Sequence, residues 1–496
     1  MKAVWLGLTI VTVLLFLPHH WSAELSDPDA FYHMKMAQLL TTQGVIQQFP
    51  WLPYTTLNQH FTDQHLLFHV LMMPFVTWGD PFVGIKLFTI TLATVFIIVF
   101  ATTLRAVGLR WWLPVTLALL VTVPFTFRLN LVKATPLALI LLCLAWLGIV
   151  KKRWWWVSAI TVVYVWSYGG FAMLYLVLGC WLVSQWLTQP WRSWASTLWP
   201  MLAVGTGTVL GLIVNPYFPN NILFYWDQLV QIGIINYRDS ISVGAEWYTY
   251  NIAELLLGSV VLFSAAIVSL TLLIIQRRRW AQLDWFAVFL ALLGIALTIK
   301  SRRYVEYFGP YLAIAVAIWL RHQVVTWAGV VQLMVRQWKI ASLAVAVLAV
   351  VIFTTLPVVL ADVERNISDV RGGISVTKFK HSSQWLQTHA PPGSVVLHSD
   401  WDDFPSLFYY NSQAVYMAGL DPTFMYRFNP TLYQLWVDLT TGDYHGDVSA
   451  ALTTLAVDYV LIEHDHVAME RLIKQTTRAR LVYQDDEVTV YQVVTK

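Results

Sequence analysis

The chain has 496 residues, of which 57% are hydrophobic and only 12% are charged. Soluble domains carry about 25% charged residues, so a water-soluble fold is excluded for most of this length. The formal net charge is +3 with neutral histidines, which provides no long-range positive field for nucleic acid. Cys143 and Cys180 both lie in apolar stretches and indicate small buried side chains, not a disulfide framework or a metal set.

Apolar runs near the length that crosses a bilayer recur along most of the chain and predict about eleven transmembrane helices. The first run follows Lys2 and is not followed by a small-residue cleavage site, so we expect an uncleaved span. The expected spans are 4–18, 82–104, 111–126, 135–150, 154–167, 170–187, 197–214, 252–275, 284–299, 308–320 and 340–358, with a shorter helix at 65–78.

Basic clusters fall in alternate loops, and this pattern sets the predicted orientation. If the first span enters from the cytoplasm, these clusters all lie inside, as the positive-inside rule requires. They are Arg105 and Arg110, Lys151 to Arg153, Arg192, Arg277 to Arg279, and Arg321, Arg336 and Lys339. Acids, histidines and the remaining cations gather on the other face. We therefore predict a multi-pass protein of the cell membrane with a cytoplasmic N-terminus.

The tail changes character beyond about residue 376, where short strand and helix patterns alternate. Strands are expected at 394–398, 414–418, 458–463, 479–483 and 488–493. The predicted organisation has three parts, with the tail on the non-cytoplasmic side. They are a transmembrane domain at 1–361 with a long first outer loop at 19–64, a linker at 362–376, and an extracytoplasmic α/β domain at 377–496.

The first outer loop holds two acids, Asp27 and Asp29, around Pro28. Ser26 or Asp27 ahead of the proline predicts a capped helix that lies along the membrane. Two carboxylates at such a helix start can also serve as a general base or bind a divalent cation.

Further along the same loop, His65 and His69 are four residues apart and share one helix face. A zinc site needs three or four ligands, and Asp63 is the one acid nearby. We therefore favour hydrogen-bonding roles at the mouth of a cavity over metal binding for the histidines.

Two pairs of cations stand at outer membrane edges: Arg128 with Lys133, and Arg302 with Arg303. Arginines at a boundary often extend to the lipid headgroups. The alternative is a site for the phosphate or diphosphate of a lipid, which suits a planar guanidinium.

Three further acids, one before a span and two in the tail, have either a structural or a binding interpretation. Glu246 is the one acid in a hydrophobic and aromatic stretch just before a span, where an unpartnered charge is costly. Trp401 and Asp402 follow the strand at 394–398, and Asp421 follows the strand at 414–418. The ends of strands in α/β sheets bind ligands, but turns are also rich in aspartate.

This layout resembles the GT-C superfamily of membrane glycosyltransferases, which use polyprenyl-phosphate-linked sugars. Asp27-Pro28-Asp29, with a helix to Leu40 and a following Tyr-His pair, is similar to the first-loop motif of oligosaccharyltransferase catalytic subunits. Ser242 to Glu246 resembles the outer-loop motif in which that family uses a glutamate. Arg302-Arg303-Tyr304 is similar to the arginine that meets the lipid diphosphate.

The chain also departs from the oligosaccharyltransferase pattern. The second outer loop, Phe127 to Lys133, has no acid, and Ser399 to Asp403 matches the Trp-Trp-Asp-Tyr-Gly signature only in part. A basic second loop is closer to members that use monophosphate-linked single sugars. The departures put a metal site of the oligosaccharyltransferase type, and transfer to asparagine, in doubt.

The hypothesis from the sequence is a membrane glycosyltransferase that moves a sugar or glycan from a polyprenyl-(di)phosphate donor to an acceptor protein or glycan on the non-cytoplasmic face. Its catalytic candidates are Asp29, Asp27 and Glu246. Its substrate-binding candidates are Asp63, His65, Arg128, Lys133, Arg302, Arg303, Trp401 and Asp402. Asp29, Asp63 and Glu246 are the candidate ligands if Mg or Mn is used. The alternatives are a transporter or flippase of a lipid-linked or amphipathic solute, and a non-catalytic glycan-binding scaffold.

Overall fold

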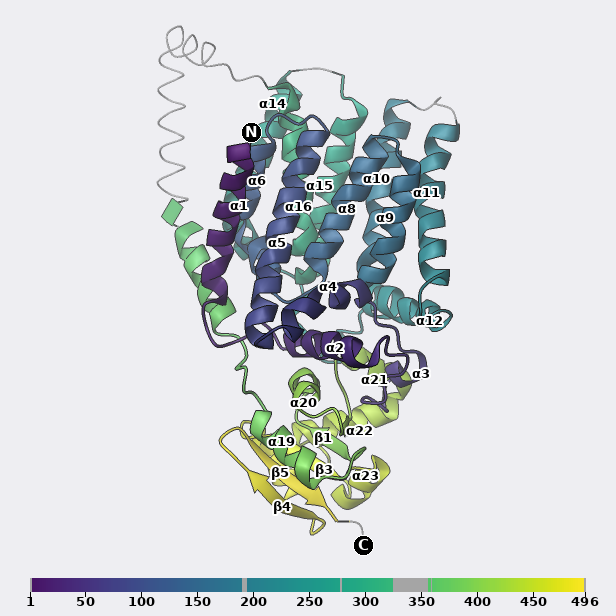
Figure 1. The fold of residues 1–496 in the computed structure, drawn as a ribbon, viewed down its shortest axis with the longest axis vertical. Helices are drawn as coiled ribbons and strands as arrows, with labels where there is room; N and C mark the ends of the chain where they lie inside the picture. The colour runs from purple at the N-terminus through teal and green to yellow at the C-terminus, as the bar shows by residue number, and fades with distance from the viewer. Residues whose placement is uncertain (1, 190–193, 277–278, 324–355, 358, 495–496) are drawn as a thin grey trace.

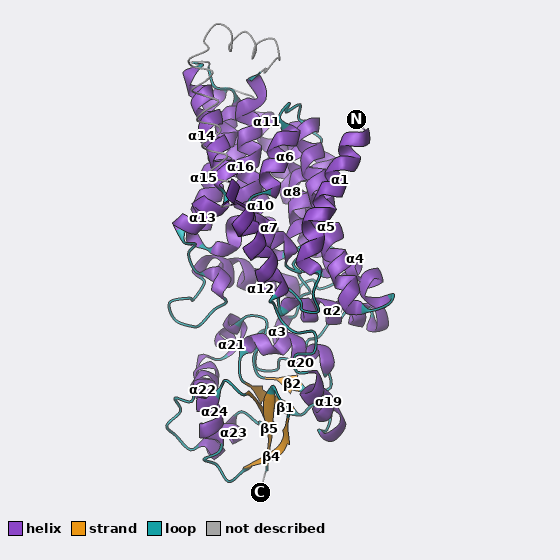
Figure 2. Ribbon diagram, turned by 90° about the vertical axis from the view of Figure 1, so that its left-hand side faces the viewer, coloured by secondary structure: helices purple, strands orange, loops and turns teal. Residues whose placement is uncertain are grey.

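The computed structural model describes residues 2–189, 194–276, 279–323, 356–357 and 359–494. A bundle of long helices occupies one end of the molecule and a small α/β unit the other, with a layer of short helices between them (Figures 1 and 2). The bundle contains α1 (Lys2–Phe16), α5 (Pro81–Ala106), α6 (Trp112–Leu120), α7 (Val123–Asn130), α8 (Thr135–Val150), α9 (Trp154–Ser167), α10 (Met173–Thr188), α11 (Trp194–Ile213), α13 (Ile252–Gly258), α14 (Val260–Ile275), α15 (Gln282–Lys300) and α16 (Val305–Trp319).

Within the described residues, five helices are long and apolar enough to cross a membrane, or up to seven if two bent pairs each count as one span. These helices confirm a multi-pass membrane protein. The count of eleven stays a prediction, because α8, α9 and α16 are helical where spans are expected but have only 16, 14 and 15 residues. The expected span at 340–358 lies almost wholly outside the described residues.

One bent pair places an arginine inside the bundle. The axes of α6 and α7 differ by 73° across a short break, although the sequence predicts one straight span at 111–126. Pro124 stands at the start of α7, where its missing N–H costs no helical hydrogen bond. The change of direction puts Arg128 on a helix, and not in a loop.

The first outer loop forms most of the layer between the bundle and the α/β unit. Its helix α2 (Asp29–Gln43) lies across the ends of the bundle helices, as expected for a helix along the membrane (Figure 1). The short helix α3 (Leu57–His60) lies in the same loop, and α4 (Leu66–Thr77) follows the loop where the shorter helix is predicted. The outer helix α12 (Asn220–Trp226) lies in the same layer.

The tail folds around a five-stranded sheet in the order β2-β1-β3-β5-β4. β2, β1 and β3 are parallel, whereas β3, β5 and β4 are antiparallel. The strands lie where the sequence predicts them: β1 (Val395–His398), β2 (Val415–Tyr416), β3 (Tyr459–Glu463), β4 (Ala479–Gln484) and β5 (Val488–Val493). The helices are α19 (Lys380–His389), α20 (Phe404–Tyr410), α21 (Pro422–Phe428), α22 (Pro430–Thr441), α23 (Val448–Thr454) and α24 (Val467–Ile473).

Buried aromatic side chains join the first loop to the α/β unit. Phe49 is fully buried, and its ring contacts those of Phe61, Phe404 and Phe408. The Trp51 indole N–H donates to the carbonyl of Ser412 at 2.8 Å. Such rings bury large areas in preferred geometries, so these contacts hold the first loop against the α/β unit.

A second connection joins the start of the first loop to the segment before the α/β unit. Leu25 and Ile374 exchange both backbone hydrogen bonds at 2.8 Å. A Cβ on Gly373 would lie 1.9 Å from the carbonyl oxygen of Leu25, so this close approach requires glycine.

Candidate active site

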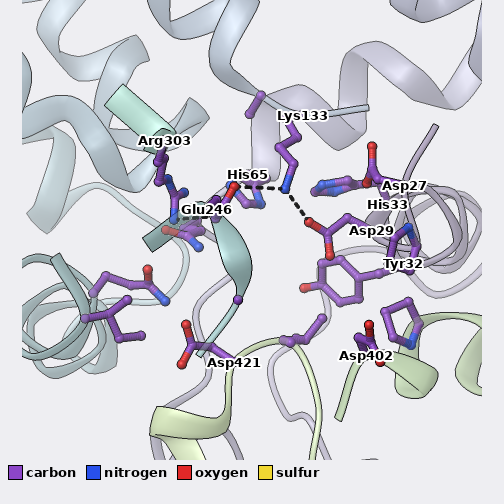
Figure 3. Close-up of a pocket in the computed structure, with 18 of the residues that line it drawn as sticks. Asp27, Asp29, Tyr32, His33, His65, Lys133, Glu246, Arg303, Asp402 and Asp421 are labelled. Atoms are coloured by element: carbon purple, nitrogen blue, oxygen red, sulfur yellow. Dashed lines mark hydrogen bonds and ion pairs between the residues drawn. The ribbon is translucent and has the colours of Figure 1, made fainter. Parts of the chain in front are cut away.

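A cavity of about 440 Å³ lies where the bundle, the first loop and the α/β unit meet. Ten of its lining side chains are labelled in Figure 3. Of the residues predicted from the sequence, those lining it are Asp27, Asp29, His65, Arg128, Lys133, Glu246, Arg303, Trp401 and Asp402. The structure thus brings together residues that span nearly 400 positions.

Alternating charges cross the membrane side of the cavity. Lys133 Nζ lies 2.8 Å from Asp29 Oδ2 and 3.7 Å from Glu246 Oε2 (Figure 3). Burial alone would destabilise the ammonium, but Asp29, Glu246 and Asp27 raise its pKa above the ordinary range. Lys133 therefore stays charged between two carboxylates from different loops.

Glu246 is surrounded by cations. Arg128 Nη1 donates to its Oε2 at 2.8 Å, and Arg303 Nη1 lies 3.2 Å from its Oε1. Although burial favours the neutral acid, Lys133, Arg303 and Arg128 together hold the pKa of Glu246 well below its usual range. In the described structure the Glu246 carboxylate thus lies within ion-pair distance of three cations at the cavity wall.

A buried glutamate behind the cavity orients the arginine. Glu306 Oε2 accepts from Arg128 Nη2 at 3.1 Å and from Arg128 Nε at 3.3 Å, and Thr135 donates to the same oxygen. This bifurcated contact uses one edge of the guanidinium and leaves Nη1 directed at Glu246.

Asp27 occupies a more buried position than Asp29. The predicted side-chain cap of α2 is absent, because Asp27 Oδ2 instead accepts the Val132 N–H at 3.0 Å. Burial raises the pKa of Asp27 from 3.8 to about 6, against the opposing effect of Lys133. Such a carboxyl group can exchange a proton near neutral pH.

The α/β unit supplies the opposite wall. β1 and β2 are parallel, so the turns after them lie at the same edge of the sheet. These turns bring Trp401, Asp402 and Asp421 to the cavity. Burial, followed by repulsion from Asp400 and Glu463, raises the pKa of Asp402 from 3.8 to about 6. The strand-end interpretation of these acids therefore agrees with their placement.

Two predicted residues do not line the cavity. Arg302 Nε donates to the carbonyl of Thr249 at 3.1 Å, and its guanidinium lies over the Tyr250 ring. Asp63 is buried, with Oδ2 2.7 Å from His69 Nδ1 and Oδ1 accepting the His65 N–H.

The carboxylates suggested as metal ligands do not fit a divalent ion. Mg²⁺ and Mn²⁺ prefer several oxygen ligands, but the Lys133 ammonium lies between Asp29 and Glu246. Asp63 is hydrogen-bonded to two histidine residues elsewhere. A requirement for Mg or Mn stays a prediction.

Sequence reasoning missed several lining residues. Tyr168 follows the predicted span at 154–167, and its hydroxyl accepts from Arg303 Nη2 at 3.2 Å. Its ring stacks on His65, and Trp247 lies under the Arg303 guanidinium at 4.8 Å. His33 and Tyr32 also reach the cavity from α2. The resemblance of the Tyr-His pair after Asp29 to the first-loop motif was the one feature of the sequence that pointed to Tyr32 and His33 as site residues.

No protein-family profile and no curated protein matches the chain. Solved structures are similar in fold. The oligosaccharyltransferase AglB from Archaeoglobus fulgidus, in complex with an inhibitory peptide and a dolichol-phosphate, aligns with TM-score 0.64 and 12% identity over 99% of this chain and 74% of that chain. ArnT from Cupriavidus metallidurans, bound to undecaprenyl phosphate, aligns with TM-score 0.57 and 13% identity over 99% of this chain and 97% of that chain.

A mutant of the arabinofuranosyltransferase AftD from Mycobacteria aligns with TM-score 0.62 and 13% identity over all of this chain and 42% of that chain. All three are GT-C glycosyltransferases. The chain therefore has the GT-C fold, in agreement with the resemblance found in its sequence.

Proposed function

We propose that the chain is a membrane glycosyltransferase that moves a sugar or glycan from a polyprenyl-(di)phosphate donor to an acceptor. The observation that carries the proposal is the convergence of Arg128, Lys133 and Arg303 on one side of a cavity that also holds Asp29 and Asp27. Cations and carboxylates are thus available together, where a departing phosphate and an incoming nucleophile would both need them.

The three cations suit the leaving group. When the bond between the anomeric carbon and the phosphate oxygen breaks, negative charge develops on the phosphate. Fixed donors aimed at such charge lower the barrier. The rigid hold of Glu306 on Arg128 keeps one guanidinium oriented without the substrate. A lipid phosphate would enter this cavity from the membrane side.

The carboxylates suit the acceptor. Displacement at the anomeric carbon requires a nucleophile that is oriented and loses a proton. Asp29 is the leading candidate, because its side chain faces the cavity from the start of α2 (Figure 3). Asp27 and Glu246 shape the local charge. Trp401 and Asp402 face this region from the α/β unit and would hold an acceptor protein or glycan.

The fold supports the donor class. AglB is described with a dolichol-phosphate and ArnT with undecaprenyl phosphate. The orientation proposed from the basic loops places the cavity and the α/β unit on the non-cytoplasmic face, with the N-terminus in the cytoplasm.

The test is sugar release by the purified protein from a panel of labelled polyprenyl-phosphate and polyprenyl-diphosphate sugars. Wild type is compared with Asp29→Asn and with Asp239→Asn, whose side chain is 96% exposed. Turnover that is lost only in Asp29→Asn supports the proposal. No turnover with any donor, or equal turnover in all three proteins, contradicts it and favours a transporter or a glycan-binding scaffold.

A further inference from the structure

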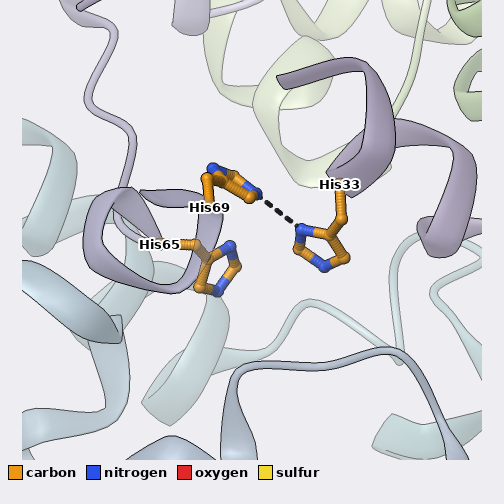
Figure 4. A group of neighbouring side chains, drawn as sticks. All are labelled: His33, His65 and His69. Carbon is orange, nitrogen blue, oxygen red and sulfur yellow. Dashed lines mark hydrogen bonds between the residues drawn. The ribbon is translucent and has the colours of Figure 1, made fainter. Parts of the chain in front are cut away.

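Three histidine side chains converge at the edge of the cavity. His33 comes from α2, His65 immediately precedes α4, and His69 lies one turn into α4 (Figure 4). One ring nitrogen from each lies within 4.8 Å of those from the other two. His33 and His69 are 4% and 0% exposed, and His65 is half-buried.

Hydrogen bonds orient one of these rings. His69 Nδ1 lies 2.7 Å from Asp63 Oδ2, so the carboxylate accepts a hydrogen bond from the Nδ1–H group. The lone pair on His69 Nε2 is then directed at the cluster, where His33 Nδ1 lies 2.8 Å away (Figure 4). A carboxylate that fixes the far nitrogen of a histidine in this way is the usual support of a histidine bound to a metal.

The ring of His65, the third histidine, has a nitrogen that could coordinate a metal ion. The ring nitrogens of His65 make no side-chain hydrogen bond within the described part of the chain, and His65 and His33 both line the cavity. His65 stacks on Tyr168 at 5.8 Å between centroids, which fixes its plane. A solute in the cavity therefore has access to the cluster.

We propose that His33, His65 and His69 form a binding site for a divalent transition metal of the zinc class, with its fourth coordination position open to the cavity. Three imidazoles and an open position suit zinc, copper, nickel or cobalt, and suit magnesium or calcium poorly. The site differs from the carboxylates weighed above, because its ligands are nitrogen atoms and Asp63 acts only through His69.

Binding requires a small rearrangement. Zn–N bonds of about 2.0–2.1 Å in a tetrahedron place neighbouring nitrogens about 3.3 Å apart. His33 Nδ1 and His69 Nε2 would therefore separate by about half an ångström, and the proton on His33 Nδ1 would move to His33 Nε2, so that both rings bind the ion as neutral imidazoles. The bound ion would link α2, which begins at Asp29, to α4.

The test uses the full-length protein with its purification tag removed. The protein is stripped with a chelator, dialysed against Zn²⁺ or Co²⁺, and analysed for metal by mass spectrometry and for Co²⁺ by visible absorption. The variants are His33→Gln, His65→Gln, His69→Gln and Asp63→Asn. His60→Gln is the control, because His60 lies in the same loop but is paired with Asp227.

About one equivalent of metal in wild type and in His60→Gln is expected, with tetrahedral Co²⁺ bands. Each variant of the trio should bind at least about tenfold more weakly, and Asp63→Asn about 10–100-fold more weakly. Less than about a tenth of an equivalent in wild type, or full binding in all three trio variants, overturns the proposal and leaves a hydrogen-bonded relay. Asp63→Asn retains all three ligands and gives an answer if a trio variant does not fold.

Discussion

The Lys133 ammonium donates to the Asp29 carboxylate at 2.8 Å, although 104 positions separate the two residues. The first outer loop and the turn between α7 and α8 therefore position each other. This ion pair holds both side chains at the cavity. A cation and an acid therefore lie close together where a phosphate and a nucleophile would meet.

Lys133→Met should lower turnover at least about 100-fold, because a fixed donor to the departing phosphate is lost. Lys133→Arg, which retains the charge, should keep a larger share of the activity. Lys86→Met is the matched control, since Lys86 bonds the carbonyl of Ser22 and does not line the cavity. Release of labelled sugar is the measurement, and equal rates for the Lys133→Met and Lys86→Met proteins would contradict the assignment.

The neighbouring arginines should behave differently. Arg303→Met should weaken binding of undecaprenyl phosphate about tenfold or more, because a charge-assisted hydrogen bond is worth about 1.5–3 kcal/mol. Arg302→Met should change it less than about threefold, because Arg302 bonds the loop carbonyl of Thr249 outside the cavity. Binding of a fluorescent lipid phosphate measures both. A larger loss of lipid-phosphate binding in Arg302→Met than in Arg303→Met would show that Arg302, and not Arg303, contacts the phosphate.

Glu246→Gln should bind polyprenyl phosphate about tenfold more tightly than wild type. The substitution removes a negative charge that Arg128, Lys133 and Arg303 share, so these cations attract an anionic ligand more strongly, although Glu306 and Asp29 still pair with Arg128 and Lys133. Turnover should nevertheless fall, since the proposed site loses a carboxylate that shapes its local charge. Glu254→Gln on α13 is the control. Unchanged or weaker lipid binding by Glu246→Gln would show that Glu246 does not compete with phosphate.

The raised pKa of Asp27 predicts a pH-dependent stability difference. A carboxyl group whose folded pKa exceeds its unfolded value stabilises the fold below about pH 4 and loses this contribution as pH rises through about 6. Asp27→Asn should therefore match wild type near pH 4 and exceed its free energy of unfolding by about 1–3 kcal/mol at pH 7. Unfolding midpoints in detergent from pH 4 to 8 test this.

The control for that series is Asp239→Asn, which should follow wild type throughout because its side chain is exposed. A wild-type protein that gains stability relative to Asp27→Asn between pH 4 and 6 would show that Asp27 is more stable as the anion.

Phe49→Ala should destabilise the protein by about 3–5 kcal/mol, as expected for a fully buried phenylalanine. Because Phe49 contacts Phe404 and Phe408, the α/β unit should separate from the first loop. Faster proteolysis before α19 would report this separation. Trp21→Ala, at a side chain that is 73% exposed, should leave the cleavage rate unchanged.

The sequence was sufficient to predict the membrane class and the strands of the tail, because apolar runs and period-two patterns are local signals. It did not predict the break between α6 and α7, since the run at 111–126 is apolar throughout and Pro124 can start a helix as well as end one. Arg128 was therefore expected in a loop.

The site was predicted in part, for a similar reason. Charges at apolar boundaries identified Asp29, Lys133, Glu246 and Arg303 without showing that they pair with one another. The sequence did not single out His33 as a candidate site residue, because its hydrogen-bond partner His69 lies 36 positions further along the chain. Contacts of this kind depend on how helices cross, which local patterns do not record.

The wall formed by residues 401–424 has a consequence for biosynthesis. These residues follow all the described bundle helices, so a chain made from its N-terminus contains Asp29, Lys133 and Glu246 long before the cavity has its second wall. Until the tail is made, the face that packs against Phe404 and Phe408 stays uncovered. The cavity is therefore complete only when nearly the whole chain has been synthesised, and a chain that stops before α20 would present its charges without an enclosed site.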